Sequence, residues 1–116
     1  MDSKEILKAA YDAIADKKGE NTKIIDISEI SVIADYFIVT NGTSTSQVKA
    51  ISDNVAEKLH DLGTDVIRTE GYGSASWILM DFGSIIVHVF SKDDRLFYDL
   101  ERIWSDGHLI SIEDLQ

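Results

Sequence analysis

The Gly83-Ser84 pair lies between two apolar runs and constrains the fold of this chain more than any other feature. A glycine in the first position of such a pair is typical of a two-residue β-hairpin turn, so 77–82 and 85–90 are predicted to be antiparallel strands. Phe82 then faces Ile85, and the pairing continues outward to Trp77 and Phe90. Because cross-strand partners share a face and faces alternate along each strand, this register assigns every side chain of the hairpin to one of two faces.

The two faces of the hairpin differ in character. One has no polar atom beyond a thioether and is expected to face the core: Ile78, Met80, Phe82, Ile85, Val87 and Val89. The other is called the mixed face and carries aromatic, aliphatic and titratable side chains: Trp77, Leu79, Asp81, Ile86, His88 and Phe90. We expect the mixed face to lie open to solvent as a docking surface, because exposed aromatic anchors dominate interface energies. The alternative is that the last helix covers Trp77 and Phe90.

The rest of the chain reads as helices and strands in alternation. We expect a helix over 3–18 that ends in a left-handed stop at Gly19. A second helix is expected over 44–62, with Ser44 as cap, Leu62 in its buried stripe and Gly63 as stop, and a third from Ser91 or Asp93 to Gly107. Strands are expected over 23–28, 36–40 and 65–70. The order α-β-β-α-β-β-β-α predicts an α/β (α+β-like) fold, a mixed sheet of about five strands packed by helices. We expect one domain over residues 1–116, with 106–116 as a tail that can fray.

The charge composition indicates which class of partner the chain can bind. The chain has 11 Lys and Arg residues against 21 Asp and Glu residues, a formal net charge of -10. Phosphate backbones repel such a protein, so we do not expect direct nucleic-acid binding. We expect a basic protein as the partner. The chain has no cysteine, no apolar signal-peptide core and no run near the length of a membrane span. We therefore expect a cytoplasmic protein without a membrane contact.

Motifs for bound ligands are weak. The Gly42–Ser46 segment between a strand and a helix could attract an anion or simply cap the helix, and it lacks the frame of a phosphate-binding loop. Gly71-Tyr72-Gly73 lacks the third glycine of a dinucleotide fingerprint, so we expect a loop there. The three histidines, His60, His88 and His108, are dispersed, so neither a metal site nor a cofactor is expected.

Four residues keep alternative roles at this point. His88 could be a hydrogen-bonded packing residue, a partner contact or an acid/base group. Asp81 could be a solvated carboxylate or a salt-bridge acceptor for a partner's Lys or Arg. Arg95 could form an ordinary i,i+4 pair with Asp99, or Arg95 and Tyr98 could flank the mixed face.

Several segments between residues 24 and 104 recur in order in one known family. They are Ala34-Asp35-Tyr36-Phe37-Ile38-Val39, Gly42-Thr43-Ser44 before Val48-Lys49-Ala50-Ile51, Glu70-Gly71, Trp77-Ile78-Leu79-Met80-Asp81-Phe82-Gly83, Val87-His88-Val89-Phe90, and Arg95-x-x-Tyr98-x-Leu100-Glu101-x-x-Trp104. With these motifs the chain resembles the ribosomal silencing factor family, also called RsfS or Iojap. It departs from the family at Ser84, where an acidic residue is frequent, and at Ser46-Gln47, where a basic pair is frequent. Both positions are therefore left out of the candidate site.

The resemblance implies a protein that binds the large ribosomal subunit through ribosomal protein L-fourteen, on the face that meets the small subunit. Occupying that face would block subunit joining and lower translation when nutrients are scarce. The partner contacts that the motifs imply are Trp77, Asp81, His88, Phe90, Arg95 and Tyr98. The sequence leaves self-association as a homodimer open.

The family fold is related to nucleotidyltransferases, so the resemblance also raises an enzyme as an alternative. Such enzymes hold Mg²⁺ with two or three carboxylates on adjacent strands. Here the segment 65–70 lacks an Asp-x-Asp/Glu pair, and Asp81 stands alone on its strand. We therefore expect no catalysis; a protein-interaction module outside the ribosome is the other alternative.

Overall fold

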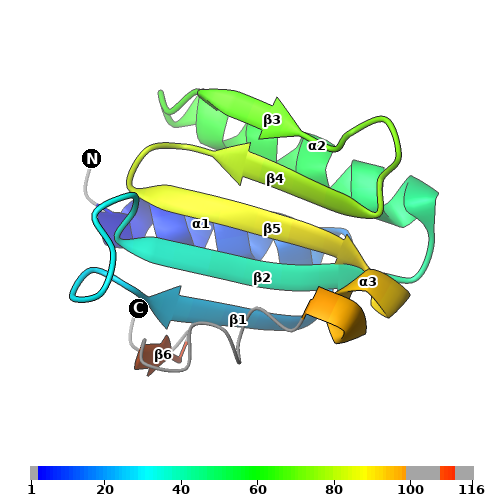
Figure 1. Ribbon diagram of the computed structural model, residues 1–116. Helices are drawn as coiled ribbons and strands as arrows, with labels where there is room; N and C mark the ends of the chain where they lie inside the picture. The colour runs from blue at the N-terminus through cyan, green and yellow to red at the C-terminus, as the bar shows by residue number, and fades with distance from the viewer. Residues whose placement is uncertain (1–2, 99–107, 112–116) are drawn as a thin grey trace.

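The computed structural model describes residues 3–98 and 108–111 (Figure 1). Its elements are α1 (Ser3–Asp16), β1 (Glu20–Asp26), β2 (Tyr36–Gly42), α2 (Thr45–Asp61), β3 (Arg68–Glu70), β4 (Trp77–Asp81), β5 (Ile85–Ser91), α3 (Lys92–Tyr98) and β6 (His108–Ile110). This is the predicted order with one further strand at its end. The predicted stop of the last helix at Gly107 lies outside the described residues.

All six strands form one sheet in the order β3-β4-β5-β2-β1-β6. Strands β2 and β5 are parallel and every other neighbouring pair is antiparallel, which confirms the predicted mixed sheet. In Figure 1, α1 and α2 lie side by side behind the sheet, whereas the short α3 lies at the end where β2 and β5 finish. The two faces of the sheet therefore have very different surroundings.

The predicted hairpin forms with the predicted register. The partners run from Asp81 and Ile86 to Trp77 and Phe90, and the Phe82 N–H donates to the Ile85 carbonyl over 2.9 Å. Gly83 has φ 92°, a value that glycine adopts without strain. All six residues of the apolar face are buried with the apolar sides of α1 and α2 in the main core, so the assignment of that face is confirmed.

The start of α2 is capped by the predicted residue. The Ser44 Oγ accepts a hydrogen bond from the Gln47 N–H over 3.1 Å. The Gln47 side chain closes a wider cap, because its Oε1 accepts from the Thr43 N–H over 2.6 Å and its Nε2 donates to the Lys18 carbonyl over 3.0 Å. Gly63 ends the helix with φ 87°, as predicted. Leu62, predicted to be buried, is 40% exposed and lies just beyond the last residue of α2 as its C-cap.

Three further expectations about the backbone are corrected. The left-handed residue after α1 is Lys18, with φ 62°, and not Gly19; Gly19 instead lies so close to Ile14 and Thr40 that a side chain would not fit. The strand expected over 65–70 covers only Arg68–Glu70. Residues 108–110 form a further strand, β6, that pairs with β1, so the sheet has six strands among the described residues where about five were expected.

Candidate functional site

The mixed face lies on the side of the sheet away from α1 and α2. Its β4 half is partly exposed at Trp77, Leu79 and Asp81, as the burial of that strand alternates. Its β5 half is buried: Ile86 is 8% exposed, His88 4% and Phe90 0%. The expectation that the mixed face is open to solvent is therefore wrong for the β5 half, and the β4 half is only partly exposed.

The two halves of the mixed face have different neighbours in the sheet. Strand β5 lies between β4 and β2, so its side chains pack against neighbours on both sides. On the mixed face, Ile86 and Phe90 join a second apolar cluster with residues from β1, β2 and the segment between them: Ile25, Ile27, Ala34, Phe37 and Val39. Strand β4 has only the short β3 beyond it, and all three residues of β3 are exposed.

Aromatic rings hold Trp77 in one orientation. Its ring stacks on Phe90 with centroids 5.0 Å apart and an interplanar angle of 26°. Its Nε1–H donates to the His88 Nδ1 over 3.1 Å. The ring of Phe37, from β2, meets the His88 ring edge to face at 4.7 Å. One side of Trp77 is thus fixed by packing and a hydrogen bond, while part of the side chain reaches solvent.

His88 is a neutral imidazole. Its Nδ1 accepts the indole hydrogen bond, so the ring proton belongs on Nε2, which is buried and has no hydrogen-bond partner among the described residues. Burial disfavours the imidazolium and lowers the pKa of His88 to about 4. Of its three alternative roles, the structure favours the hydrogen-bonded packing residue.

Asp81 lies at the turn end of β4, on the same face as Trp77. Its Oδ1 accepts the Gly83 N–H over 2.8 Å, so the carboxylate helps to fix the hairpin turn. The side chain remains partly exposed. Asp81 can therefore hold the turn with one oxygen and present the other to a cationic partner.

Arg95 connects α3 to the sheet. Its Nη1 donates to the Glu20 carbonyl over 3.2 Å and to the Asn41 Oδ1 over 3.0 Å. The buried Asn41 in turn donates through Nδ2 to the Glu20 Oε1 over 3.0 Å. Arg95 is thus engaged in fixing α3, an arrangement that its sequence context did not indicate. Asp99 lies outside the described residues, and Tyr98 ends α3 with its side chain outside the described part.

The structure therefore places the six candidate residues at different locations and does not gather them into one site. It brings Trp77, His88 and Phe90 into contact, places Asp81 at the opposite end of β4, and puts Arg95 in the middle of α3. Sequence reasoning missed Phe37, Glu20 and Asn41 as supporting residues. No local signal identifies them, because each meets its partner across a distance in sequence.

The other candidate sites have structural roles. The hydroxyl of Ser44 and the amide of Gln47 are both used in the α2 cap. Gly71-Tyr72-Gly73 is a loop, as expected; the Tyr72 hydroxyl donates to Asp53 over 3.1 Å and the Lys49 Nζ lies 5.3 Å from the Tyr72 ring centroid. In the part of the chain that the structure describes, no three His, Asp or Glu side chains could hold a metal ion.

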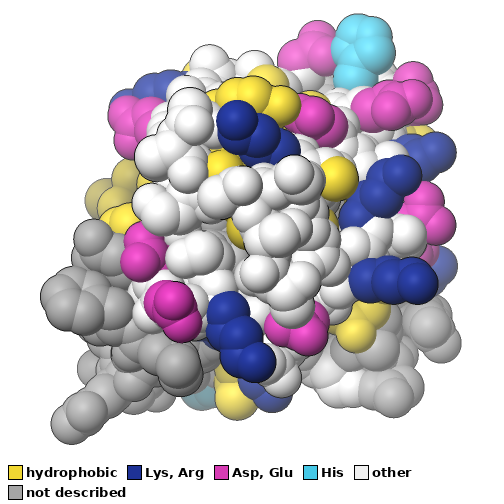
Figure 2. Space-filling view, turned by 90° about the vertical axis from the view of Figure 1, so that its right-hand side faces the viewer, with side chains coloured by type: hydrophobic (Ala, Val, Ile, Leu, Met, Phe, Trp, Pro, Cys, Tyr) yellow, Lys and Arg dark blue, Asp and Glu magenta, His cyan; other side chains and the backbone are white. Residues whose placement is uncertain are grey.

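The surface charge at the α2 start is mixed. Figure 2 views the end of the sheet where β2 and β5 finish, and Lys and Arg side chains there are interspersed with Asp and Glu side chains. No continuous basic patch appears on this face, which agrees with the net charge of -10. No helix among the described residues is both long enough and apolar enough to cross a bilayer.

These features define a mixed α/β domain with an aromatic cluster that reaches the surface at one strand. The family described as "Ribosomal silencing factor during starvation" matches residues 1–116, and this chain belongs to it. The chain is 40% identical over 113 residues to "Ribosomal silencing factor RsfS" of Bacillus subtilis, covering 97% of this chain and 96% of that protein. It is 39% identical over 113 residues to the protein of the same name from Halalkalibacterium halodurans, covering 97% of each.

A solved structure agrees with the fold. The crystal structure of a protein from Chromobacterium violaceum superposes with a TM-score of 0.89 at 37% identity, covering 96% of this chain and 92% of that one. The resemblance found in the sequence motifs is therefore confirmed at the level of the family and of the mixed α/β fold.

Proposed function

We propose that this chain binds the large ribosomal subunit in the cytoplasm through ribosomal protein L-fourteen and so prevents joining to the small subunit. Membership of a silencing-factor family supports the biological role. The net charge of -10 supports a basic protein as the direct partner and disfavours contact with ribosomal RNA. Repression would be steric and would form no covalent bond, so the protein would not be an enzyme.

The observation that carries this proposal is that Trp77 is partly exposed and yet held in a fixed orientation. The indole is partly exposed, yet Phe90 and His88 fix its orientation before any partner arrives. A rigid aromatic side chain loses little conformational entropy on binding, which is why such residues are frequent hot spots. Asp81, on the same strand, adds a partly exposed carboxylate for a Lys or Arg of the partner.

The six candidate residues then take different roles. We assign direct contact to Trp77 and Asp81, and keep Tyr98 as a proposed contact. The buried His88 and Phe90 hold Trp77 in place, and Arg95 holds α3 against the sheet. The last three are positioning residues rather than contact residues.

The proposal is tested with purified subunits. Large and small subunits are mixed with increasing protein, and the fraction of joined ribosomes is measured on a sucrose gradient. We expect excess protein to lower that fraction. An unchanged yield of joined ribosomes at saturating protein would refute the proposed mechanism.

Trp77→Ala tests the site itself. Truncating an interface anchor weakens binding by about 2 kcal/mol or more, which is roughly 30-fold in Kd. Leu62→Ala is the matched control, because Leu62 is an exposed apolar residue on the helical layer. Co-sedimentation with large subunits should show a loss for Trp77→Ala and none for Leu62→Ala; equal binding of the two variants would contradict the site assignment.

A further inference from the structure

The segment between β1 and β2 presents three aliphatic side chains to solvent. Val32 is fully exposed, Ile33 is 68% exposed and Ile30 is 42% exposed. These three residues are called the aliphatic tip. Scattered exposed aliphatic residues are ordinary, but three within four positions of one loop form an apolar patch of the kind that marks interaction sites.

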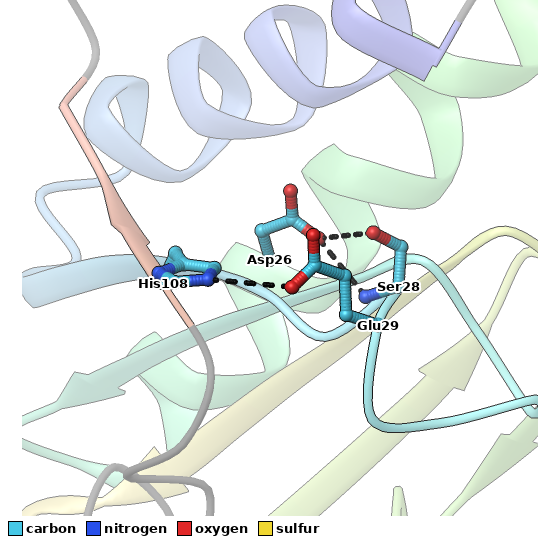
Figure 3. Close-up of polar contacts among 4 residues, drawn as sticks. All are labelled: Asp26, Ser28, Glu29 and His108. Carbon is cyan, nitrogen blue, oxygen red and sulfur yellow. Dashed lines mark hydrogen bonds and ion pairs between the residues drawn. The ribbon is translucent and has the colours of Figure 1, made fainter.

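The aliphatic tip is held by hydrogen bonds at its base. The Asp26 Oδ1 accepts from the Ser28 N–H over 2.9 Å and from the Ser28 hydroxyl over 2.7 Å (Figure 3). These hydrogen bonds lower the pKa of Asp26, so the carboxylate that anchors the loop stays ionised. Glu29 lies 3.7 Å from the His108 Nε2 on β6, as Figure 3 also shows.

The tip itself is also ordered. The Ile30 N–H donates to the Ile27 carbonyl over 3.0 Å, and the Ile33 N–H donates to the Ser31 Oγ over 3.1 Å. Beneath the tip, Ile27 and Ala34 are buried in the second apolar cluster. The exposed side chains are therefore presented by a fixed loop, and a partner would lose little free energy in ordering it.

The tip adjoins the turn of the hairpin. The Asp35 N–H, at the end of the loop, donates to the Ser84 carbonyl over 2.8 Å. On the other side of this turn, Ile67 is 70% exposed and its N–H donates to the Asp81 carbonyl over 2.7 Å. Figure 1 places the β1–β2 loop and the β4–β5 turn at the same end of the sheet. The aliphatic tip and Asp81 therefore lie at the same end of the sheet, next to the hairpin turn.

The acidic residues around the aliphatic tip indicate what kind of partner can bind there. Glu29 and Asp35 flank the tip and are exposed, and the whole chain carries a net charge of -10. A second copy would bring the same acidic border against itself and be repelled, whereas Lys and Arg side chains around an apolar groove would be attracted.

We infer that the aliphatic tip inserts into an apolar groove bordered by Lys or Arg on the same basic ribosomal protein that the mixed face contacts. This inference rests on the proposed function and extends its interface around the hairpin turn. Trp77 and the tip would then form two separate anchors, with Asp81 between them.

The test compares two variants in full-length protein. Val32→Ser combined with Ile33→Ser removes the apolar surface, and Leu62→Ser makes the same change at an exposed leucine on the helical layer. We expect the double variant to bind purified large subunits at least about tenfold more weakly than the wild type, with Leu62→Ser unchanged. Thermal unfolding should be the same for all three, because the altered side chains are exposed; Val32→Ser alone serves if the double variant unfolds earlier.

The outcomes separate this inference from the proposed function. If the wild type does not bind large subunits, the proposed function fails and this inference fails with it. If the wild type binds and the tip variant binds equally well, only this inference is overturned. Sedimentation of the free protein tests whether a second copy of the chain binds the tip instead. If the wild type is a dimer, and the tip variant is a monomer that still binds large subunits, then a second copy covers the tip and this inference is overturned.

Discussion

The buried imidazole of His88 predicts a specific loss of stability in mild acid. In the folded chain the pKa of His88 is about 4, against an ordinary value of 6.5 that applies when the chain is unfolded. Above pH 6.5 the group is neutral in both states and contributes no pH dependence. Between 6.5 and about 4 the unfolded chain takes up a proton that the folded chain does not, so stability falls as the pH falls.

The magnitude follows from the size of the pKa difference. Each pH unit in this window lowers the free energy of unfolding by about 1.4 kcal/mol, and the full window lowers it by about 3 kcal/mol. Below a pH of about 4 the contribution levels off, because His88 is then protonated in both states. A change of about 3 kcal/mol is a large part of the total stability of a domain of this size.

Urea unfolding followed by circular dichroism, repeated from about pH 7 to about pH 4.5, measures this loss. The matched variant is His88→Asn, whose side-chain oxygen occupies the Nδ1 position and can accept from Trp77 but does not titrate. Both proteins share every carboxylate, so the difference between their slopes isolates His88. Equal slopes for the wild type and His88→Asn across this window would refute the assignment of a neutral, buried imidazole.

Two further predictions concern stability. Ile78→Ala, in the main core, should lower the free energy of unfolding by about 2–5 kcal/mol in urea; a loss below about 1 kcal/mol would contradict the burial of this face. Gly71→Ala should cost about 1 kcal/mol or more, because φ is 82° and the new methyl group would meet the Trp77 carbonyl. Gly73→Ala, where a methyl group has open space, should leave the thermal midpoint nearly unchanged; a similar loss in both variants would show that loop flexibility, and not the conformation of Gly71, is responsible.

The hairpin could be predicted because its determinants are local. The turn at Gly83-Ser84 sets the register, and alternation then assigns each side chain to a face, so the whole apolar face was identified correctly. The Ser44 cap and the Gly63 stop are local in the same sense. These features depend on residues within a few positions of one another.

The errors concern contacts between distant segments. Burial of His88 and Phe90 depends on β2 and β1 lying beside β5, which the hairpin alone does not specify. Strand β6 has only three residues and forms because β1 offers it an edge. Lys18, and not Gly19, adopts the left-handed conformation, and Gly19 lies where a side chain would meet Ile14 and Thr40.

The division of the mixed face into a buried and a half-exposed part links stability to docking. Phe90 and the neutral His88 belong to the core, yet both hold Trp77 in the orientation in which a partner would meet it. A face exposed on both strands would leave the indole free to change rotamer, and binding would have to restrict it. Burying one strand therefore does not weaken the case for a docking site; it explains how a single exposed aromatic residue can be rigid enough to serve as an anchor.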